Sequence, residues 1–446
     1  MHKKLFFLFF IIFVFIYFNS CDLKLGSIYN LPNELQNQLE PWQGDIYFLE
    51  HELPKLHKNV YHSISKEEYN QKIEQLKIDC LNLEPEKQWV KLREFTTLIG
   101  DSHTSYFSKM SEAFPLNLVV LKDGVFVTAA LEENRHLVRT NSVDSKPARV
   151  ELVAIEKIPI FSESDNTSNS TNNIFSILKS ILSHENESHL KNKMASSLLD
   201  PNILYGAGIT STKSKCTMSF KFPNGTIEDI VLEAKSLKNF KDLNWVVYYD
   251  DNYLGDRSVL PQYIQYERDT YYAKYYPDLK NTFYILYNSC SNNLEQSFSD
   301  FIIEQYSAIN IKTIDKVVVD LRNNGGGDSR VIKPLYNLLE SELSNSQLYV
   351  IIGPKTFSSA LMNAVDLSNK YDGILIGNPT GGKPNHYGEV KHIQLPTGNS
   401  IYWSIKYFTM IPGDNSDSLY PDVSIDITSE DYFSLKDPIL NKIFEL

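Results

Sequence analysis

The spacing of hydrophobic residues changes along the chain, and each change marks a different predicted structure. From residue 32 to about residue 100, apolar positions recur every three or four residues, which predicts a mainly helical region. Between residues 116 and 131 the pattern becomes two short apolar runs joined by an Asp-Gly pair, which is typical of a β-hairpin. A helical segment is predicted between residues 174 and 199, and a second hairpin, around an Asn-Gly pair, between 217 and 232. The middle of the chain is therefore expected to be rich in β-strands.

From about Asp256 onward, short apolar runs alternate with longer segments of helical periodicity. The apolar runs are continuous rather than alternating, as in strands of a sheet that is covered on both faces. This order of strand and helix predicts an α/β layer. The predicted strands are residues 282–287, 316–321, 348–352 and 373–376, and the predicted helices are residues 298–308, 331–343 and 359–370.

The length of the chain predicts more than one domain. At 446 residues it exceeds the roughly 250–300 residues at which a single hydrophobic core stops growing, so two or three domains are expected. Following the changes of pattern, we place an N-terminal helical region at residues 22–112, a β-rich middle domain at 113–255 and an α/β domain at 256–446.

Residues 1–21 have the form of an export signal. Two lysines precede an apolar run from Leu5 to Phe18, which is shorter than the roughly 20 residues that span a bilayer. A cleaved signal peptide is therefore expected rather than a permanent membrane helix. The residues Phe-Asn-Ser-Cys that end this segment resemble a bacterial lipobox, in which Cys21 would be lipidated and become the mature N-terminus. We expect an exported protein, and the sequence leaves open whether it is a cell-surface lipoprotein or is secreted.

Charge and cysteine usage exclude several classes of function. The 43 Lys and Arg residues against 55 Asp and Glu residues give a net charge of −12 without a long basic run, which argues against a nucleic-acid partner. Besides Cys21, the chain contains Cys80, Cys216 and Cys290, which lie far apart and show no metal-ligand spacing. We expect three buried thiols, at most one disulfide, and no metal or organic cofactor.

Two turns of the predicted α/β layer have residue types that suit chemistry. The strand at 316–321 leads into three glycines, Gly325 to Gly327, whose backbone amides can bind a developing negative charge. The next strand leads to Ser358 at the start of a helix, where a hydroxyl can project from the carboxyl edge of the sheet. Both turns also have ordinary explanations, because glycines form flexible connections and serine is a preferred helix cap.

A serine nucleophile needs a proton acceptor, and the sequence offers two candidates. His103 lies in a short polar loop after a helix that is expected to end at Gly100. Lys383 follows the strand at 373–376 and would return to the same edge of the sheet, where burial can lower the pKa of a lysine enough for it to act as a base. A solvated surface histidine and an exposed loop lysine are the ordinary alternatives.

Several segments, taken in order, resemble the C-terminal processing peptidases, the serine-protease family that includes the tail-specific proteases and the tricorn core protease. VVVDLRNNGGG resembles the strand and turn D-L-R-x-N-G-G-G of that family, TFSSALMNA resembles its nucleophile segment, and NPTGGKPN resembles its G-x-x-T-x-G-K segment. The tail YPDV resembles the closing V-x-P-D-[IV] of the family, and the upstream run IGDSHT resembles the Ser-His pair of the tricorn branch. The resemblance covers the chain from about Tyr284 to its C-terminus, plus the short upstream match.

The resemblance implies that Ser358 is the nucleophile, with the backbone N–H groups of Gly326 and Ser359 as the oxyanion hole. It leaves two choices for the base. In the tail-specific branch a lysine 25 residues after the serine has this role, and 383 − 358 = 25 places Lys383 there. In the tricorn branch the base is an upstream histidine, which His103 would be, with Ser102 as its partner.

We favour His103 as the base, because Lys383 is followed by Pro384 and His386 rather than by the Gly and Gln of the Ser-Lys enzymes. The tricorn branch also has a glutamate near its closing segment, where this chain has Asn415. The acid that would orient the base is therefore left open. The apolar run at residues 150–160 resembles the closing strand of a PDZ domain without a recognisable carboxylate-binding loop, so the middle domain is predicted to be a degenerate PDZ-like module.

Together these features predict an α/β catalytic core with the ClpP/crotonase-like arrangement of layered sheet and helices, preceded by the helical and PDZ-like regions. The predicted function is that of an exported serine-type peptidase, which hydrolyses peptide bonds of a polypeptide substrate through an acyl-enzyme. Contact with a membrane is expected only through a lipid anchor at Cys21. The alternative is a non-catalytic homologue that uses the same fold to bind peptides or lipophilic ligands.

Overall fold

The computed structural model describes residues 28–140, 145–162, 173–250, 255–309 and 314–446. The predicted signal segment and Cys21 lie outside these residues. Within the described part of the chain, no helix has both the length and the apolar character needed to cross a bilayer. The three remaining cysteines, Cys80, Cys216 and Cys290, are free and buried, as the sequence predicts.

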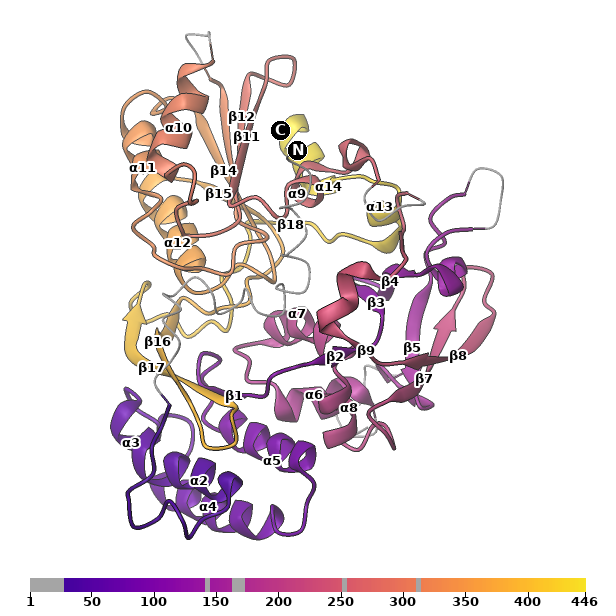
Figure 1. Cartoon of the computed structure of the whole chain (residues 1–446). Helices are drawn as coiled ribbons and strands as arrows, with labels where there is room; N and C mark the ends of the chain where they lie inside the picture. Colours follow the sequence, from indigo (N-terminus) through magenta and orange to yellow (C-terminus); the bar gives the residue numbers. More distant parts are fainter. Residues whose placement is uncertain (1–27, 141–144, 163–172, 251–254, 310–313) are drawn as a thin grey trace.

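The N-terminal unit is helical, and a hairpin from far along the chain completes its core. Tyr69, Phe95 and other apolar side chains of its helices pack against Ile401 and Trp403 of that hairpin. The hairpin strands β16 and β17 extend from the α/β layer to these helices, where β17 pairs with β1 (Figure 1). The loop after α5, which contains His103, is thereby held against the α/β layer. The elements are α2 (Pro41–Tyr47), α3 (Leu53–Leu56), α4 (Lys66–Asp79), α5 (Pro85–Thr97), β1 (Ser105–Phe107), β16 (Asn385–Gln394) and β17 (Ser400–Thr409), with a π-helix (Phe48–Glu52) between α2 and α3.

The middle unit is built on an antiparallel sheet with the order β10-β4-β5-β7-β8, to which β3 and β6 add at β4 and β5. Both predicted hairpins are confirmed, as the pairs β3–β4 and β7–β8. The predicted helical segment at 174–199 is two helices rather than one, because the polar residues between them include Asn186, whose side chain caps the second helix. The elements are β3 (Leu116–Leu121), β4 (Gly124–Leu131), β5 (Glu151–Ile155), β6 (Ile158–Pro159), α6 (Ile174–Ile181), α7 (Glu187–Ser197), α8 (Pro201–Gly206), β7 (Lys215–Lys221), β8 (Ile227–Glu233) and β10 (Trp245–Val247).

The C-terminal unit is the predicted α/β layer, with a six-stranded sheet of order β11-β12-β13-β14-β15-β18. Strands β12, β13, β14, β15 and β18 are parallel to one another, and β11 is an antiparallel edge strand. Alternate side chains of the central strands face α10, α11 and α12 on one side and α9, α13 and α14 on the other. The elements are α9 (Gln262–Gln265), β11 (Tyr271–Tyr276), β12 (Thr282–Tyr287), α10 (Phe298–Ser307), β13 (Lys316–Asp320), α11 (Lys333–Glu340), β14 (Gln347–Ile352), α12 (Ser359–Tyr371), β15 (Ile374–Gly377), β18 (Val423–Ser424), α13 (Ser429–Phe433) and α14 (Pro438–Glu445).

A closed ion-pair network fixes the carboxyl end of β13. Arg322 is buried and donates to both oxygens of Asp320, and its two terminal nitrogens donate to Asp437 at 3.1 and 2.9 Å. Tyr284 donates its hydroxyl to Asp320 at 2.8 Å, and the guanidinium lies 4.2 Å from the ring centroid of Tyr263. The network therefore ties the strand end to the start of α14, directly before the glycine turn.

Candidate active site

Ser358 lies at a strained turn between β14 and α12. Its φ and ψ angles are 52° and −125°, a conformation that non-glycine residues rarely adopt. The buried Thr356 holds the turn, because its hydroxyl donates to Leu321 O at 2.9 Å and accepts from Gly353 N at 3.0 Å. The side chain of Ser358 makes no capping hydrogen bond to α12, so helix capping does not explain why serine stands here. The hydroxyl is half-buried at the carboxyl edge of the sheet.

The glycine turn lies directly against this serine. Gly326 has a φ angle of +111°, and a Cβ atom at this position would come within 2.8 Å of Ser358 Cβ. Its N–H donates to Asn324 Oδ1 at 2.9 Å, so Gly326 must release this bond to act as an oxyanion donor. Among the described residues, the N–H groups of Gly327 and Ser359 have no hydrogen-bond acceptor. The structure thus brings the two predicted oxyanion residues to the predicted nucleophile, with Gly327 as an additional free donor.

His103 approaches the serine turn from the N-terminal unit. Its ring stacks on Phe357, the residue before Ser358, with 4.5 Å between the centroids, and lies 5.9 Å from the ring of His386. The side chain is 5% exposed, and neither ring nitrogen has a hydrogen-bond partner in the described part of the chain. His103 is therefore a buried histidine, and the alternative of a solvated surface group does not hold.

The carboxylate of Asp101 is fixed beside this histidine. It accepts from His57 Nε2 at 3.1 Å, from Thr104 Oγ1 at 2.6 Å and from the backbone N–H of His103 at 2.9 Å, and its Oδ1 lies 3.7 Å from His103 Nδ1. Burial acts to raise the pKa of Asp101, but the interactions with His103 and His57 hold it well below its usual range. The negative charge beside His103 is thus permanent at neutral pH.

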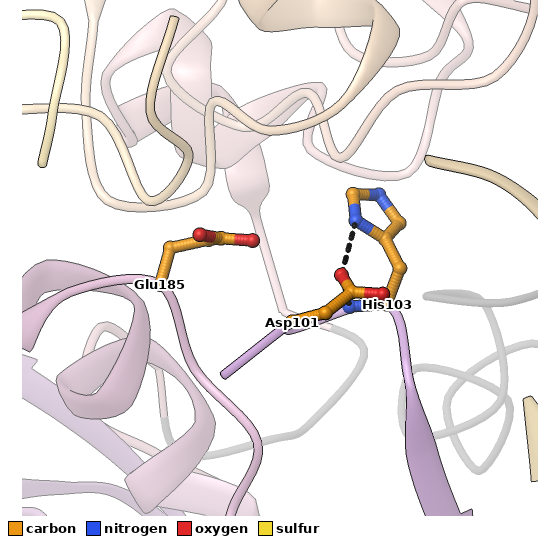
Figure 2. A group of neighbouring side chains, drawn as sticks. All are labelled: Asp101, His103 and Glu185. Carbon is orange, nitrogen blue, oxygen red and sulfur yellow. Dashed lines mark hydrogen bonds and ion pairs between the residues drawn. The ribbon is translucent and has the colours of Figure 1, made fainter. Parts of the chain in front are cut away.

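A second carboxylate, that of Glu185, comes from the segment between α6 and α7. Ser102 donates its hydroxyl to Glu185 Oε1 at 2.8 Å, and Lys383 Nζ lies 2.9 Å from Glu185 Oε2. Figure 2 shows Glu185 and His103 on opposite sides of Asp101, with the carboxylate of Glu185 directed toward Asp101. Asn186 holds this segment in place, because its amide contacts Thr380 O and Asp417 O at 2.9 and 2.7 Å.

Glu185 is not indicated by any motif of the sequence, and the position of the orienting acid was left open near Asn415. The carboxylates on either side of Asn415 are used locally, by Ser416 N at Asp414 and by the hydroxyl of Tyr420 at Asp417. The only sequence feature that marks Glu185 is the short polar segment that interrupts the helical pattern between α6 and α7. This segment matches no known motif.

Lys383 is held as an ammonium ion rather than as a free amine. Burial acts to lower its pKa, but the charge of Glu185 and the contact with it raise the pKa above the usual value. The side chain is 32% exposed and reaches the cluster through Glu185. Both predicted bases therefore lie at the same site, and Lys383 is engaged there by Glu185.

Helix α7 presents a second histidine and a half-buried lysine to the same region. The ring of His189 lies 4.4 Å from that of Phe357, so that Phe357 contacts both His103 and His189. Lys193, one turn further along α7, donates to Ser183 O at 2.5 Å, and burial lowers its pKa to about 8. A cavity of about 880 Å³ is lined by β3, by α7 and by residues 352–355, which lead to Ser358.

Comparisons with known proteins find similarity in structure only. The sequence matches no family profile and no curated protein. Mature CPAF complexed with lactacystin is 13% identical, with a TM-score of 0.56, over 91% of this chain and 97% of the other. A second structure of mature CPAF gives 13% identity and a TM-score of 0.55 over 91% and 95% of the two chains.

A photosystem II D1 C-terminal processing protease is also matched, with 12% identity and a TM-score of 0.39, over 90% of this chain and 98% of that one. The mature CPAF structures match almost end to end, so the likeness includes the helical and middle units as well as the sheet. The likeness to mature CPAF concerns the fold alone, and this chain shares the fold of those structures, with a layered α/β core.

Proposed function

We propose that this chain is an exported serine peptidase that hydrolyses peptide bonds through an acyl-enzyme on Ser358, with His103 as the general base. The observation that carries the proposal is the position of the buried His103 ring on Phe357, next to the strained Ser358, with neither ring nitrogen hydrogen-bonded to another described residue. A buried polar group without partners is rare, because it is costly. Catalysis gives these nitrogens a use that packing does not.

The reaction follows from the placement of the groups. The hydroxyl of Ser358 attacks the carbonyl carbon of the substrate, and its proton passes to His103. The negatively charged oxygen of the tetrahedral intermediate lies near the N–H groups of the glycine turn and of Ser359. The Ser359 hydroxyl joins the two segments, because it donates to Gly327 O at 2.5 Å. The C–N bond then breaks as His103 returns the proton to the leaving amine, and water releases the acyl group by the reverse proton transfers.

Asp101 and Glu185 act as positioning residues in this account. Asp101 places a fixed negative charge 3.7 Å from His103 Nδ1, which stabilises the imidazolium formed during the reaction. Glu185 holds Ser102, the residue before the base. The raised pKa of Lys383 supports His103 over Lys383, because an ammonium ion has no lone pair to accept a proton.

The second candidate is the non-catalytic homologue that binds peptides or lipophilic ligands. The observation that favours it is the lack of a hydrogen bond between Ser358 and His103 among the described residues. Catalytic hydrogen bonds are often long before substrate binds, so this observation is compatible with both candidates. The two differ in whether Ser358 reacts.

The test is labelling by a fluorophosphonate, which forms a covalent bond with activated serines. The wild-type protein is expected to be labelled, and Ser358→Ala is expected to abolish labelling with an unchanged circular dichroism spectrum. Ser359→Ala, which removes the neighbouring hydroxyl but keeps its backbone N–H, is the matched control and should retain labelling. An unlabelled but folded wild-type protein favours the binding homologue, and labelling that persists in Ser358→Ala refutes the nucleophile.

Export and lipidation of Cys21 are part of the proposal and are tested separately. The basic start and short apolar run of residues 1–21 support export. Expression of the full chain in a bacterial host, followed by fractionation and mass analysis of the mature N-terminus, distinguishes a lipidated Cys21 from a secreted form. A retained N-terminal Met1 in a soluble intracellular fraction would contradict export.

A further inference from the structure

We propose that Asp101, His103 and Glu185 form a binding site for a transition-metal dication of the Zn²⁺ type, and that the bound ion switches off the base. One ligand atom from each residue lies within 4.8 Å of the other two. Figure 2 shows the three side chains converging from the α5–β1 loop and from the segment before α7. The binding site stands on geometry alone, whereas the switching-off rests on the proposed function.

The spacing is close to that of a zinc site. Metal–ligand distances of about 2.0–2.2 Å place the ligand atoms of a tetrahedral site roughly 3.4 Å apart. The separation of 3.7 Å between His103 Nδ1 and Asp101 Oδ1 already approaches this value. Glu185 must therefore move inward by about 1 Å, and its link to Ser102 is the bond that such a movement strains.

The unpaired nitrogens of His103 are the independent indication of a ligand. The side chain is 6% exposed and lies beside two carboxylates. Neither ring nitrogen has a hydrogen-bond partner among the described residues. An imidazole with two carboxylates suits zinc and similar ions, whereas calcium and magnesium prefer oxygen ligands alone. Three protein ligands leave a fourth position for water.

The ammonium group of Lys383 is a cation already bound to this cluster. Its ammonium group lies 2.9 Å from Glu185 Oε2, and its long, partly exposed side chain is free to swing outward. A dication that binds Glu185 must displace this ammonium group. Lys193 on α7 also interacts electrostatically with Glu185 and Asp101. Its positive charge would repel a dication bound by these carboxylates. The lysines therefore weaken the site, and their removal should strengthen it.

The binding half is tested by calorimetric titration of Zn²⁺ into the full chain carrying Ser358→Ala, which removes the proposed nucleophile and leaves the three proposed ligands in place. We expect one saturable site. His103→Gln or Glu185→Gln, each added to Ser358→Ala, should weaken it by roughly 100-fold or more, because loss of even an outer partner of a metal site costs roughly 10–100-fold. Lys383→Met should tighten binding, and Mg²⁺ should not compete.

His136→Gln is the matched control, because His136 lies in the middle unit and its Nε2 lies 3.4 Å from Glu228, outside the cluster of Asp101, His103 and Glu185. Circular dichroism identifies any variant that fails to fold, and only folded variants are compared. Lys383→Met keeps the test sharp if another variant unfolds, because the proposal predicts tighter binding by folded Lys383→Met protein. Absence of a saturable site, or equal affinity in His103→Gln, Glu185→Gln and their Ser358→Ala parent, overturns the proposal.

The switching-off half is tested by fluorophosphonate labelling of the wild-type chain with and without Zn²⁺. Coordination uses a lone pair of His103 and should slow labelling at the concentrations that saturate the site, with recovery after chelation. Saturable binding without any change in labelling would refute His103 as the base and leave the metal site standing. Normal labelling without zinc binding would refute the metal site and leave the proposed function standing.

Discussion

Two buried clusters of charged side chains lie at the carboxyl edge region of the α/β sheet, and they differ in how completely their atoms are paired. In the network of Arg322 with Asp320 and Asp437, guanidinium and carboxylates satisfy one another, and Tyr284 adds a further hydrogen bond. In the cluster of Asp101, His103 and Glu185, the acids are fixed by hydrogen bonds, but neither ring nitrogen of His103 has a hydrogen-bond partner among the described residues.

The difference separates a structural role from a chemical one. A buried ion pair whose donors are all used has no capacity for a further ligand, and its removal leaves an uncompensated charge. A buried imidazole whose nitrogens form no hydrogen bond within the described residues can still accept a proton or bind a ligand. Burial of charge alone would not have distinguished the two clusters.

The largest effect is expected at the base. His103→Gln should slow fluorophosphonate labelling and peptide turnover by roughly 100- to 10,000-fold, the usual contribution of a general base. Lys383→Met should slow them by less than about tenfold, because a partly exposed ion pair contributes up to about 1 kcal/mol. The comparison uses rates measured on folded protein at one pH. Equal losses in both variants would remove the distinction between His103 and Lys383.

The closed network is expected to affect stability rather than rate. Asp437→Asn removes one charge of the pair with the buried Arg322 and should lower the free energy of unfolding by about 3 kcal/mol. Urea unfolding at neutral pH measures this loss, and the labelling rate of the protein that stays folded should be unchanged. A large loss of labelling with no loss of stability would assign this network to the chemistry.

Glu185 sharpens the comparison, because it is both paired and placed next to the base. Glu185→Gln should lower kcat by roughly 10- to 100-fold with little change in KM, since a hydrogen bond to a charged group contributes about 1.5–3 kcal/mol. A cycle with Ser102→Ala should show that the two losses do not add, because Glu185 acts through Ser102. Additive losses, or a matching fall in stability, would indicate a purely structural acid.

The smallest effect concerns Asp45, a buried carboxylate whose partners are the hydroxyls of Tyr106 and Thr397. Burial raises its pKa to about 6, above the unfolded value. The folded state therefore binds the proton more tightly, so this residue should add about 1 kcal/mol of stability as the pH falls from 7 to 5. Asp45→Asn should remove this part of the pH dependence in denaturant titrations. An unchanged difference between wild type and variant at the two pH values would contradict it.

The sequence predicted the central sheet well, because its strands are continuous apolar runs that suit burial on both faces. Ser358 and His103 were also predicted, the former from a turn of recognisable form. The hairpin of β16 and β17 was not predicted, because its residues are half-exposed and its partner, β1, lies almost 300 residues earlier in the sequence.

Glu185 could not have been predicted from local pattern. It lies in a short polar break between α6 and α7, and its role depends on Asn186 joining that break to loops of the α/β unit. Such a contact is set by packing between units and leaves no periodic trace. The same holds for the pairing of Lys383 with Glu185, which changes the expected state of the lysine.

The most direct test of the central claim is to map the site of the fluorophosphonate adduct by mass spectrometry in the wild type and in His103→Gln. The account predicts a single adduct on Ser358 in the wild type and an adduct that forms far more slowly in the variant. An adduct on another residue, or equally fast modification of Ser358 without His103, would contradict it.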